Sequence, residues 1–513
     1  MSNPPSLASR KYELRWVTLA ILSLSLAIVG LDNTVLNVAI PTLQREFDAS
    51  ASELQWMVDS YILVFAGLLL MMGSLGDRFG RKRALQAGLI IFLIASFGAS
   101  VSQSTGQLIA LRAAMGIGGA LIMPSTLSVI TDVFPREERG KAIGIWAAVA
   151  GLAIGSGPLV GGILLEFFWW GSVFLVNVPV IGGALLAGLW LIPESRDPSP
   201  SRPDYPGTVL SIGMITTFVF AVIEAPERGW TDGLVLGTVT ASAALVLAFA
   251  AWEIRSRAPM LNFNYFRNMR FSMGTVAIGI AFFALFGFVF GVTQYLQFVK
   301  GFTPLEAGAA VTPIALGMVV GAGSSNRIAA KVGTTKVVAA GMLLLAAMLA
   351  AFLWFEPDTH VIILSGTVLF TSYSMGNIMA PSTDALMGAV PEAKAGIASA
   401  MNDVSRQVGG ALGVAIVGSV FASAYRSRME DAVAGLPPEA AAVTEDSVGG
   451  AVQIAASIPG EAGIALLEAA RASFTEALGI GAAVAAGVAV VGSVLVLRFM
   501  PPVHLPVVDP DDR

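Results

Sequence analysis

Three charged side chains, Asp32, Asp59 and Arg112, lie inside long apolar stretches of the sequence. A charge at the centre of a bilayer costs at least about 2.5–3.5 kcal/mol, so such a residue is rarely idle. Burial disfavours the charge of a carboxylate and a neighbouring arginine favours it, so a buried pair can exchange a proton near the working pH. We expect Asp32 and Arg112 to pair and to couple proton movement, with Asp59 nearby. The alternative is a permanent ion pair that fixes packing.

Composition places these charges in a membrane protein. The chain has 513 residues, of which 55% are hydrophobic and 13% charged, whereas a soluble domain carries about 25% charge. There is no cysteine, and the two histidines, His360 and His504, fall in an expected loop and in the C-terminal tail. We therefore expect no metal site, no cofactor, no catalytic centre and no nucleic-acid partner, and a lipid bilayer as the solvent.

Fourteen apolar stretches are long enough to cross about 30 Å of hydrocarbon, which takes roughly 20 helical residues. Each must be helical, because backbone groups in lipid need partners within the segment. We expect an all-α integral membrane protein, in which 207–253 forms either two helices or one re-entrant pair. The expected spans are 16–40, 53–73, 84–102, 106–131, 141–164, 172–192, 207–224, 234–253, 271–298, 306–329, 336–354, 361–387, 396–422 and 477–499.

The basic residues alternate between the loops that this map creates. Of the 30 Lys and Arg, 22 fall on the side of both termini, six on the opposite side, and Arg112 and Arg406 within spans. Cytoplasmic loops carry the excess of Lys and Arg. Both termini are therefore expected in the cytoplasm.

The spans and loops divide the chain into an expected order of parts. These are a cytoplasmic N-terminus (1–15), a six-helix bundle (16–192), a Pro- and Ser-rich cytoplasmic linker (193–206), two additional helices (207–253), a second six-helix bundle (254–499) and a cytoplasmic tail (500–513). The second bundle contains a long external segment, 423–476. We interpret this segment as a solvated loop, in which 461–476 is a candidate for a short helix. The alternative is a lid or hairpin that gates release on the external side.

A basic turn occurs once in each half of the chain. GDRFGRKR (76–83) follows the second span, and AKVGTTK (330–336) follows the tenth, with glycine and basic residues in corresponding positions. The repeat predicts two related halves with a site at their interface, which is a common transporter plan.

Several motifs, in order and on the expected spans, give the chain a family resemblance. They are LDNTVLNVAIP (31–41), GSLGDRFGRKR (73–83), LRAAMGIGG (111–119), GLAIGSGPLVGG (151–162), WWGSVFLVNVP (169–179) and SRQVGGALG (405–413). The chain resembles the major facilitator superfamily, specifically its branch of fourteen-helix drug:proton antiporters, which includes bacterial multidrug exporters. The resemblance implies two six-helix bundles with two extra helices between them, and a proton-coupling role for the acid of the first motif and the arginine of the third.

The expected function is export of small amphipathic drugs, cationic or neutral, across the bacterial cytoplasmic membrane by a monomer. No phosphate-binding G-x-x-x-x-G-K-[ST] motif occurs, so a proton gradient rather than ATP is expected to supply the energy. The alternatives are an exporter of an endogenous metabolite, peptide, siderophore or lipid, and an uptake symporter, in which the glycine run 151–162 would as a rule be missing.

Two further groups of residues are expected to control the conformational change. The resemblance implies that the first basic turn holds the outward-facing state together with an acid at the end of span four; simple topological anchoring is the alternative. This lock comprises Gly73, Gly76, Asp77, Arg78, Gly80, Arg81, Lys82, Arg83 and Asp132. The glycine run, which resembles an antiporter motif, permits close packing of a helix bent at proline; it comprises Gly151, Gly155, Gly157, Pro158, Gly161 and Gly162.

Aromatic and polar residues near the expected interface are candidates for the substrate site. Asp32 is a candidate counter-charge for a cationic substrate. The other candidates are Trp56, Tyr61, Phe65, Tyr295, Tyr373 and Asn377. Placement at the membrane interface explains Trp56 and Tyr295 equally well. The sequence leaves two interpretations of Arg406: its side chain donates to backbone carbonyls, or it lines the cavity.

Overall fold

The computed structural model describes residues 13–47, 49, 51–196, 204–256, 259, 261–391 and 394–501. All regular structure in this part of the chain is helical, and fourteen of its helices are long and apolar enough to cross a membrane. The predicted all-α fold and the number of spans are therefore confirmed.

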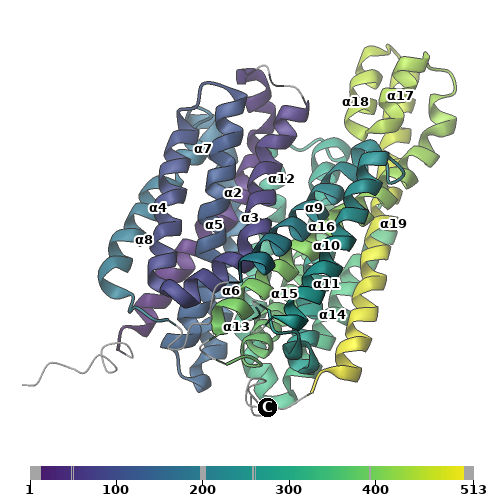
Figure 1. Cartoon of the computed structure of the whole chain (residues 1–513). Helices are drawn as coiled ribbons and strands as arrows, with labels where there is room; N and C mark the ends of the chain where they lie inside the picture. Colours follow the sequence, from purple (N-terminus) through teal and green to yellow (C-terminus); the bar gives the residue numbers. More distant parts are fainter. Residues whose placement is uncertain are drawn as a thin grey trace, which may run out of the picture.

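The first seven helices form an N-terminal bundle (Figure 1). Gly80, with φ of +116°, separates α3 from α4 at a backbone conformation that favours glycine. Ser104 caps α5, since its side chain accepts a hydrogen bond from the Gln107 amide. The helices are α2 (Arg15–Phe47), α3 (Ala51–Phe79), α4 (Arg81–Ser100), α5 (Thr105–Val133), α6 (Arg136–Phe167), α7 (Ser172–Leu175) and α8 (Asn177–Leu191).

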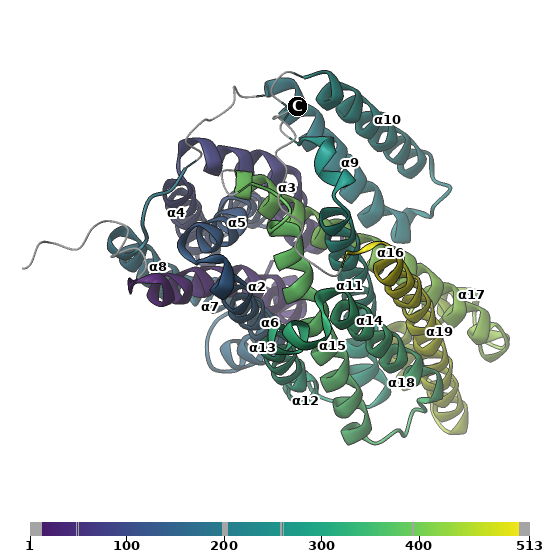
Figure 2. The same ribbon diagram turned by 90° about the horizontal axis from the view of Figure 1, so that it is seen from below.

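Two additional helices, α9 (Tyr205–Arg228) and α10 (Gly233–Arg255), lie beside the bundles, with α10 outermost (Figure 2). Asp204 caps α9 and Asp232 caps α10, so each is a separate helix. Each is also long and apolar enough to cross a membrane, which favours two spanning helices over a re-entrant pair for 207–253. Helix α9 contacts α3 and also α16 of the C-terminal bundle. At the connection between the pair, the Trp230 indole donates a hydrogen bond of 3.0 Å to Ser419 on α16.

The C-terminal bundle repeats the plan of the first. Gly333, with φ of +90°, ends α13 just as Gly80 ends α3, which agrees with the repeat of the two basic turns. The span expected at 306–329 consists of two helices, because α12 ends at Val311 and Pro313 begins α13. The helices are η1 (Phe263–Arg267), α11 (Met269–Gln294), η2 (Tyr295–Val299), α12 (Pro304–Val311), α13 (Pro313–Val332), α14 (Thr334–Ala350), η3 (Ala351–Trp354), α15 (Val361–Met387), α16 (Ala395–Val433), α17 (Pro438–Asp446), α18 (Val448–Ser457) and α19 (Glu461–Phe499).

The solvated loop expected at 423–476 is wrong. Helix α16 continues to Val433, α19 begins at Glu461, and α17 and α18 form a hairpin beyond their ends (Figure 1). The Tyr425 hydroxyl donates to the Thr444 carbonyl at 3.2 Å, which ties the hairpin to α16. The segment folds because its alanines and valines are buried in a small helical cluster. Its shape agrees with the alternative, a lid or hairpin.

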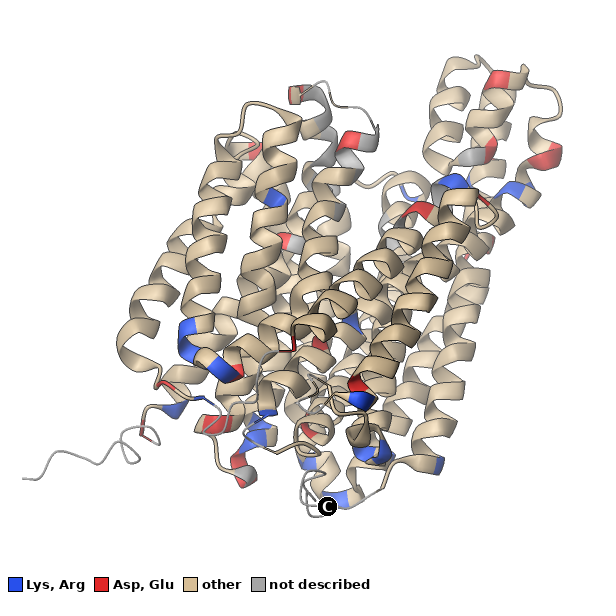
Figure 3. Ribbon diagram, in the orientation of Figure 1, with Lys and Arg blue, Asp and Glu red and all other residues tan. Residues whose placement is uncertain are grey.

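Lysine and arginine gather at one end of the molecule, opposite the α17–α18 hairpin (Figure 3). This end carries both basic turns and the C-terminal end of α19. Its placement in the cytoplasm stays a prediction from the positive-inside rule. We call it the basic end.

Candidate functional site

Asp32 and Arg112 form a buried ion pair inside the N-terminal bundle. Asp32 Oδ2 accepts a hydrogen bond from Arg112 Nη1, and the two residues are 3% and 1% exposed. The structure thus brings together the two residues that were predicted to pair. The Asp32 carboxylate faces neither lipid nor bulk solvent. The side chain of Asp59 lies outside the described part of the structure.

Five helices converge on this pair. Asn177 on α8 donates from Nδ2 to the second carboxylate oxygen at 3.2 Å and to the hydroxyl of Ser96 on α4 at 3.0 Å. Arg112 Nε donates to the carbonyl of Met57 on α3 at 3.0 Å. The guanidinium carbon also lies 4.5 Å from the centre of the Tyr61 ring, which is within cation–π range. Both ends of the ion pair are therefore hydrogen-bonded, as a buried pair requires.

Asn177 and Ser96 were not among the predicted residues. Asn177 falls in the motif WWGSVFLVNVP (169–179), where a fully buried amide in an apolar span could have drawn attention. Its partner could not be recognised, because the contact joins residues that are 145 positions apart.

The first basic turn joins the two bundles at the basic end. Both oxygens of Asp77 accept hydrogen bonds from the backbone amide of Gly396, at 2.8 and 3.0 Å. Gly396 is the second residue of α16, so the carboxylate lies at a helix N-terminus, where a negative charge is stabilised. A Cβ at Gly73 would lie 2.5 Å from the Gly396 carbonyl oxygen, so the close approach requires glycine.

The basic residues of this turn contact their own bundle. Arg81 pairs with Asp77 at 2.8 Å. The Lys82 amide donates to Glu194 at 3.1 Å, and Arg83 lies 3.5 Å from the same carboxylate. Glu194, in the linker after α8, was not predicted.

Three further members of the predicted lock are Arg78, Asp132 and Gly76. Arg78 lies over the ring of Phe79 at 5.4 Å, and Asp132 is at the end of α5 as predicted. Gly76 packs on Ala84 and Ser125. Asp77 and Gly73 both contribute to the contact between the bundles.

A second contact between the bundles lies at the same end, on the opposite side. Asn326 near the end of α13 donates from Nδ2 to the Gly140 carbonyl near the start of α6. Gly140 and Gly144 both face Asn326, and a Cβ at Gly144 would lie 3.1 Å from the Ala322 carbonyl oxygen. The molecule is therefore closed at the basic end on both sides.

The glycine run of α6 divides between two neighbours. A Cβ at Gly151 would lie 2.0 Å from Met318 Cγ, and one at Gly155 would lie 3.3 Å from the Ala315 amide, so both face α13 of the other bundle. A Cβ at Gly157 would lie 1.8 Å from Thr34 Oγ1 on α2.

The end of the run is less crowded. A Cβ at Gly162 would meet nothing within 4 Å, and Gly161 is buried. Helix α6 runs without interruption past Pro158, whose side chain lies outside the described part.

A cavity of about 150 Å³ lies between the bundles. Its walls come from α2 and α6 on one side and from α11, η2, α12, α13, α15 and α16 on the other. The polar side chains among its described lining residues belong to Thr34, Gln297 and Arg406. The volume is below the roughly 300–1,000 Å³ of a drug-sized site, so the bundles must separate further to admit such a molecule.

The predicted substrate residues do not line this cavity. Tyr61 and Phe65 are buried, and their rings stack beneath Arg112. The Tyr295 hydroxyl donates to the Glu356 carbonyl at 2.8 Å. In this conformation each of these side chains packs within its own bundle, and its role toward a substrate stays a prediction.

The other three candidates also lie elsewhere. Trp56 packs near Phe220 of α9, with ring centres 6.3 Å apart. Asn377 Nδ2 donates to the Tyr373 carbonyl at 3.0 Å, within α15. Asp32 too is outside the lining, so it provides no counter-charge in this conformation.

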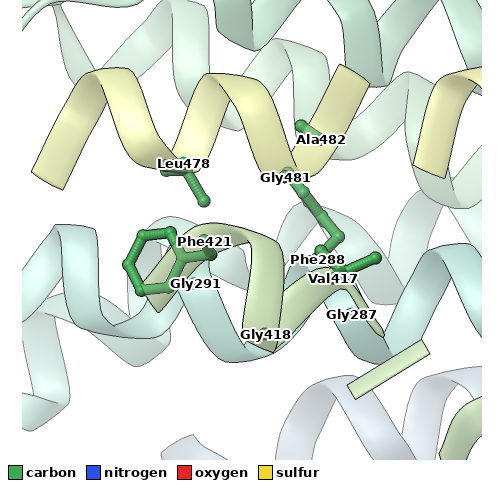
Figure 4. Close-up of a pocket in the computed structure, with 9 residues that line it drawn as sticks. All are labelled: Gly287, Phe288, Gly291, Val417, Gly418, Phe421, Leu478, Gly481 and Ala482. Atoms are coloured by element: carbon green, nitrogen blue, oxygen red, sulfur yellow. The ribbon is translucent and has the colours of Figure 1, made fainter. Parts of the chain in front are cut away.

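A second, much smaller cavity of about 10 Å³ lies between α11, α16 and α19 (Figure 4). Glycines and the apolar side chains of Phe288, Val417, Phe421 and Leu478 surround it. It has room for no substrate and reflects loose packing of small residues.

Residues 22–414 match the profile of the Major Facilitator Superfamily. The chain belongs to this superfamily. It is a multi-pass membrane transporter and not an enzyme, and the predicted family is confirmed.

Relatives of this chain include proteins named for multidrug efflux, drug export and drug resistance. The chain is 36% identical to the multidrug efflux pump LfrA of Mycolicibacterium smegmatis, over 92% of this chain and 93% of the relative. It is 35% identical to the tetracenomycin C resistance and export protein of Streptomyces glaucescens, over 94% and 91% of the two chains. It is also 35% identical to the methyl viologen resistance protein SmvA of Salmonella typhimurium, over 90% and 93%.

A solved structure shares the fold. The crystal structure of the human organic anion transporter MFSD10 (TETRAN) superimposes with a TM-score of 0.61 at 13% identity, covering 96% of this chain and all of that one. This similarity shows the fold alone.

Proposed function

We propose that this protein exports small amphipathic drugs and toxic compounds across the bacterial cytoplasmic membrane in exchange for protons. The observation that carries the proposal is the buried Asp32–Arg112 pair at the centre of the N-terminal bundle. A buried charge pair that changes protonation supplies the ion-linked step that an exporter without a nucleotide site needs. The names of the relatives, which include efflux, export and resistance proteins, support drugs as the cargo.

The proposed cycle links this pair to the contacts at the basic end. A proton on Asp32 cancels its charge, so the hydrogen bonds from Arg112 and Asn177 weaken and the bundle can change shape. Asp77 on Gly396 and Asn326 on Gly140 hold the basic end closed until that change. With both termini in the cytoplasm, as the distribution of basic residues indicates, the closed end faces the cytoplasm and the cavity releases its cargo outward. One chain contains both bundles and the cavity, so we propose a functional monomer.

The test is substrate-driven proton release from proteoliposomes that contain the purified protein. The wild type should release protons when a transported drug is added across a pH gradient. Asp32→Asn keeps the shape of the side chain but cannot lose a proton, so it should abolish the release while drug binding persists. Glu439→Gln, on the exposed hairpin, serves as the matched control and should behave as the wild type. Unchanged proton release in Asp32→Asn would refute the proposed coupling.

A further inference from the structure

Arg406 is a buried cation on the wall of the central cavity. It lies eleven residues into α16, or about 16 Å along the helix at 1.5 Å per residue. Arg406 is 5% exposed, and it borders the cavity together with residues from both bundles. The proposed function does not use it.

Arg406 has a buried donor, Nη1, that makes no hydrogen bond to the described residues. Its Nη1 lies 3.7 Å from Asp403 Oδ1, which is too long for a hydrogen bond. Arg112, by contrast, donates to both Asp32 and the Met57 carbonyl. Leaving a buried donor unsatisfied is costly, so Arg406 is suited to receive an acceptor from a bound molecule.

Aromatic rings hold the guanidinium in place. Its central carbon lies 4.7 Å from the centre of the Phe282 ring and 6.0 Å from that of Trp146. Phe282 also lines the cavity. A planar apolar molecule in the cavity would therefore meet an aromatic wall next to this donor.

Asp403 does not border the cavity, although its charge is close to Arg406. It accepts a hydrogen bond of 3.3 Å from Asn402 Nδ2, and Asn402 Oδ1 in turn accepts one of 3.0 Å from Thr383. These contacts tie the carboxylate to Asn402 and, through it, to α15. Among the described lining residues, Arg406 is the one with a charge, and none is acidic.

We propose that Arg406 is a substrate-binding residue that anchors an acceptor oxygen of the cargo. The substrate class is an aromatic, otherwise apolar compound that carries a carbonyl, phenolate or carboxylate oxygen. This inference rests on the proposed export function and names the cargo of its cavity. It favours neutral and anionic compounds, whereas a counter-charge for cations is missing from the described wall.

The test uses three probes that share one apolar body: pyrenebutyrate, pyrenebutanol and pyrenebutyl-trimethylammonium. Binding to the purified full-length protein is measured by energy transfer from tryptophan to pyrene, with empty micelles as the blank. Wild type should bind the anion and the alcohol at least several-fold tighter than the cation. Arg406→Gln should weaken binding of the anion by about tenfold or more, because a charge-assisted hydrogen bond is lost. Arg498→Gln, at the end of α19 and far from the cavity, removes the same charge and should change nothing.

Two further variants keep the outcome decisive if Arg406→Gln unfolds. Arg406→Lys retains the charge and should restore part of the anion binding. Asp403→Asn removes the neighbouring negative charge and should tighten binding of the anion relative to the cation. Equal affinities for the three probes in wild type, or preference for the cation, would overturn the inference. Binding of the anion without proton exchange would instead contradict the proposed function and leave the assignment of Arg406 intact.

Discussion

Asn177 is the residue that most directly controls the geometry of the Asp32–Arg112 pair. It is fully buried and bridges the Asp32 carboxylate to Ser96 on another helix. Arg112 holds one oxygen of Asp32 and Asn177 holds the other, so removal of the amide leaves the carboxylate half-positioned.

Asn177→Ala should therefore slow proton-coupled transport without abolishing it. Loss of one hydrogen bond to a charged group corresponds to roughly 1.5–3 kcal/mol, so we expect a rate about tenfold or more below the wild type. The measurement is drug-driven proton release in proteoliposomes. A rate as low as that of Asp32→Asn would mean that Asn177 does more than position the carboxylate.

The charge of Asp77 stabilises the state that is closed at the basic end. Asp77→Asn removes the favourable interaction of the carboxylate with the N-terminus of α16 in the other bundle. This interaction is worth about 1–2 kcal/mol at a buried site, so the open population should rise roughly 5- to 30-fold.

The absence of native cysteine allows a direct readout. Ala147→Cys places one thiol in the cavity wall, and a thiol reagent added at the basic end should label it faster when Asp77→Asn is also present. Equal labelling rates with and without the Asp77→Asn substitution would show that the contact with Gly396 does not restrain the bundles.

At the scale of the helices, α6 and α13 depend on small residues for their close contact. A methyl group at Gly151 would lie 2.0 Å from Met318 Cγ and 2.7 Å from its Cβ, so α13 or its side chain must move. Gly162 on the same helix has open space around its Cα.

Gly151→Ala should lower transport by about tenfold, because overpacking a tight contact costs roughly 1–3 kcal/mol. Gly162→Ala should be neutral and serves as the control. Efflux of a fluorescent drug from cells, corrected for the amount of protein in the membrane, measures both. Equal loss in the two variants would point to a general effect of glycine on α6 rather than to its contact with α13.

The α17–α18 hairpin covers apolar side chains at the ends of α16 and α19. Met429 and Val433 are buried there, as are Leu466 and Ala470. Replacing 436–459 with a glycine–serine linker exposes these side chains to water, so the melting temperature should fall by about 5 °C or more. The cavity has no lining residue from the hairpin, so transport at low temperature should persist. Loss of transport with unchanged stability would favour a gate.

The helical elements that sequence predicts best are those with one long apolar run. Helix α15 has the predicted limits, 361–387, since His360 caps its start and Gly388 follows its last residue. The hairpin was only the alternative to a solvated loop, because α17 and α18 have nine and ten residues. Such helices are too short for a hydropathy window that detects membrane spans.

The candidate site was predictable only in part. A charge in an apolar span is visible in the sequence, so Asp32 and Arg112 could be predicted as a pair. Contacts made by neutral or loop residues leave no such trace, which is why Asn177 and Glu194 were missed. The cavity wall depends on which face of each helix turns inward, which the type of a residue does not indicate. In this conformation Tyr61 and Tyr295 lie outside that wall.

At the scale of the whole molecule, the basic end defines the orientation in the membrane. Lys331→Cys lies in the second basic turn and Glu439→Cys in the hairpin at the other end. In intact cells, a membrane-impermeant thiol reagent should label only Glu439→Cys, and disruption of the cells should expose Lys331→Cys. The reverse pattern would place both termini outside and reverse the proposed direction of transport.

The position of α9 has a consequence for the surrounding lipid. Because this helix touches both α3 and α16, it covers one of the two seams along which the bundles shift against each other. Hydrocarbon cannot solvate exposed peptide groups, and a sliding seam that faced the bilayer directly would risk uncovering them. Helix α9 shields that seam from the bilayer. The bundles can therefore move against each other while the acyl chains contact the apolar surface of α9.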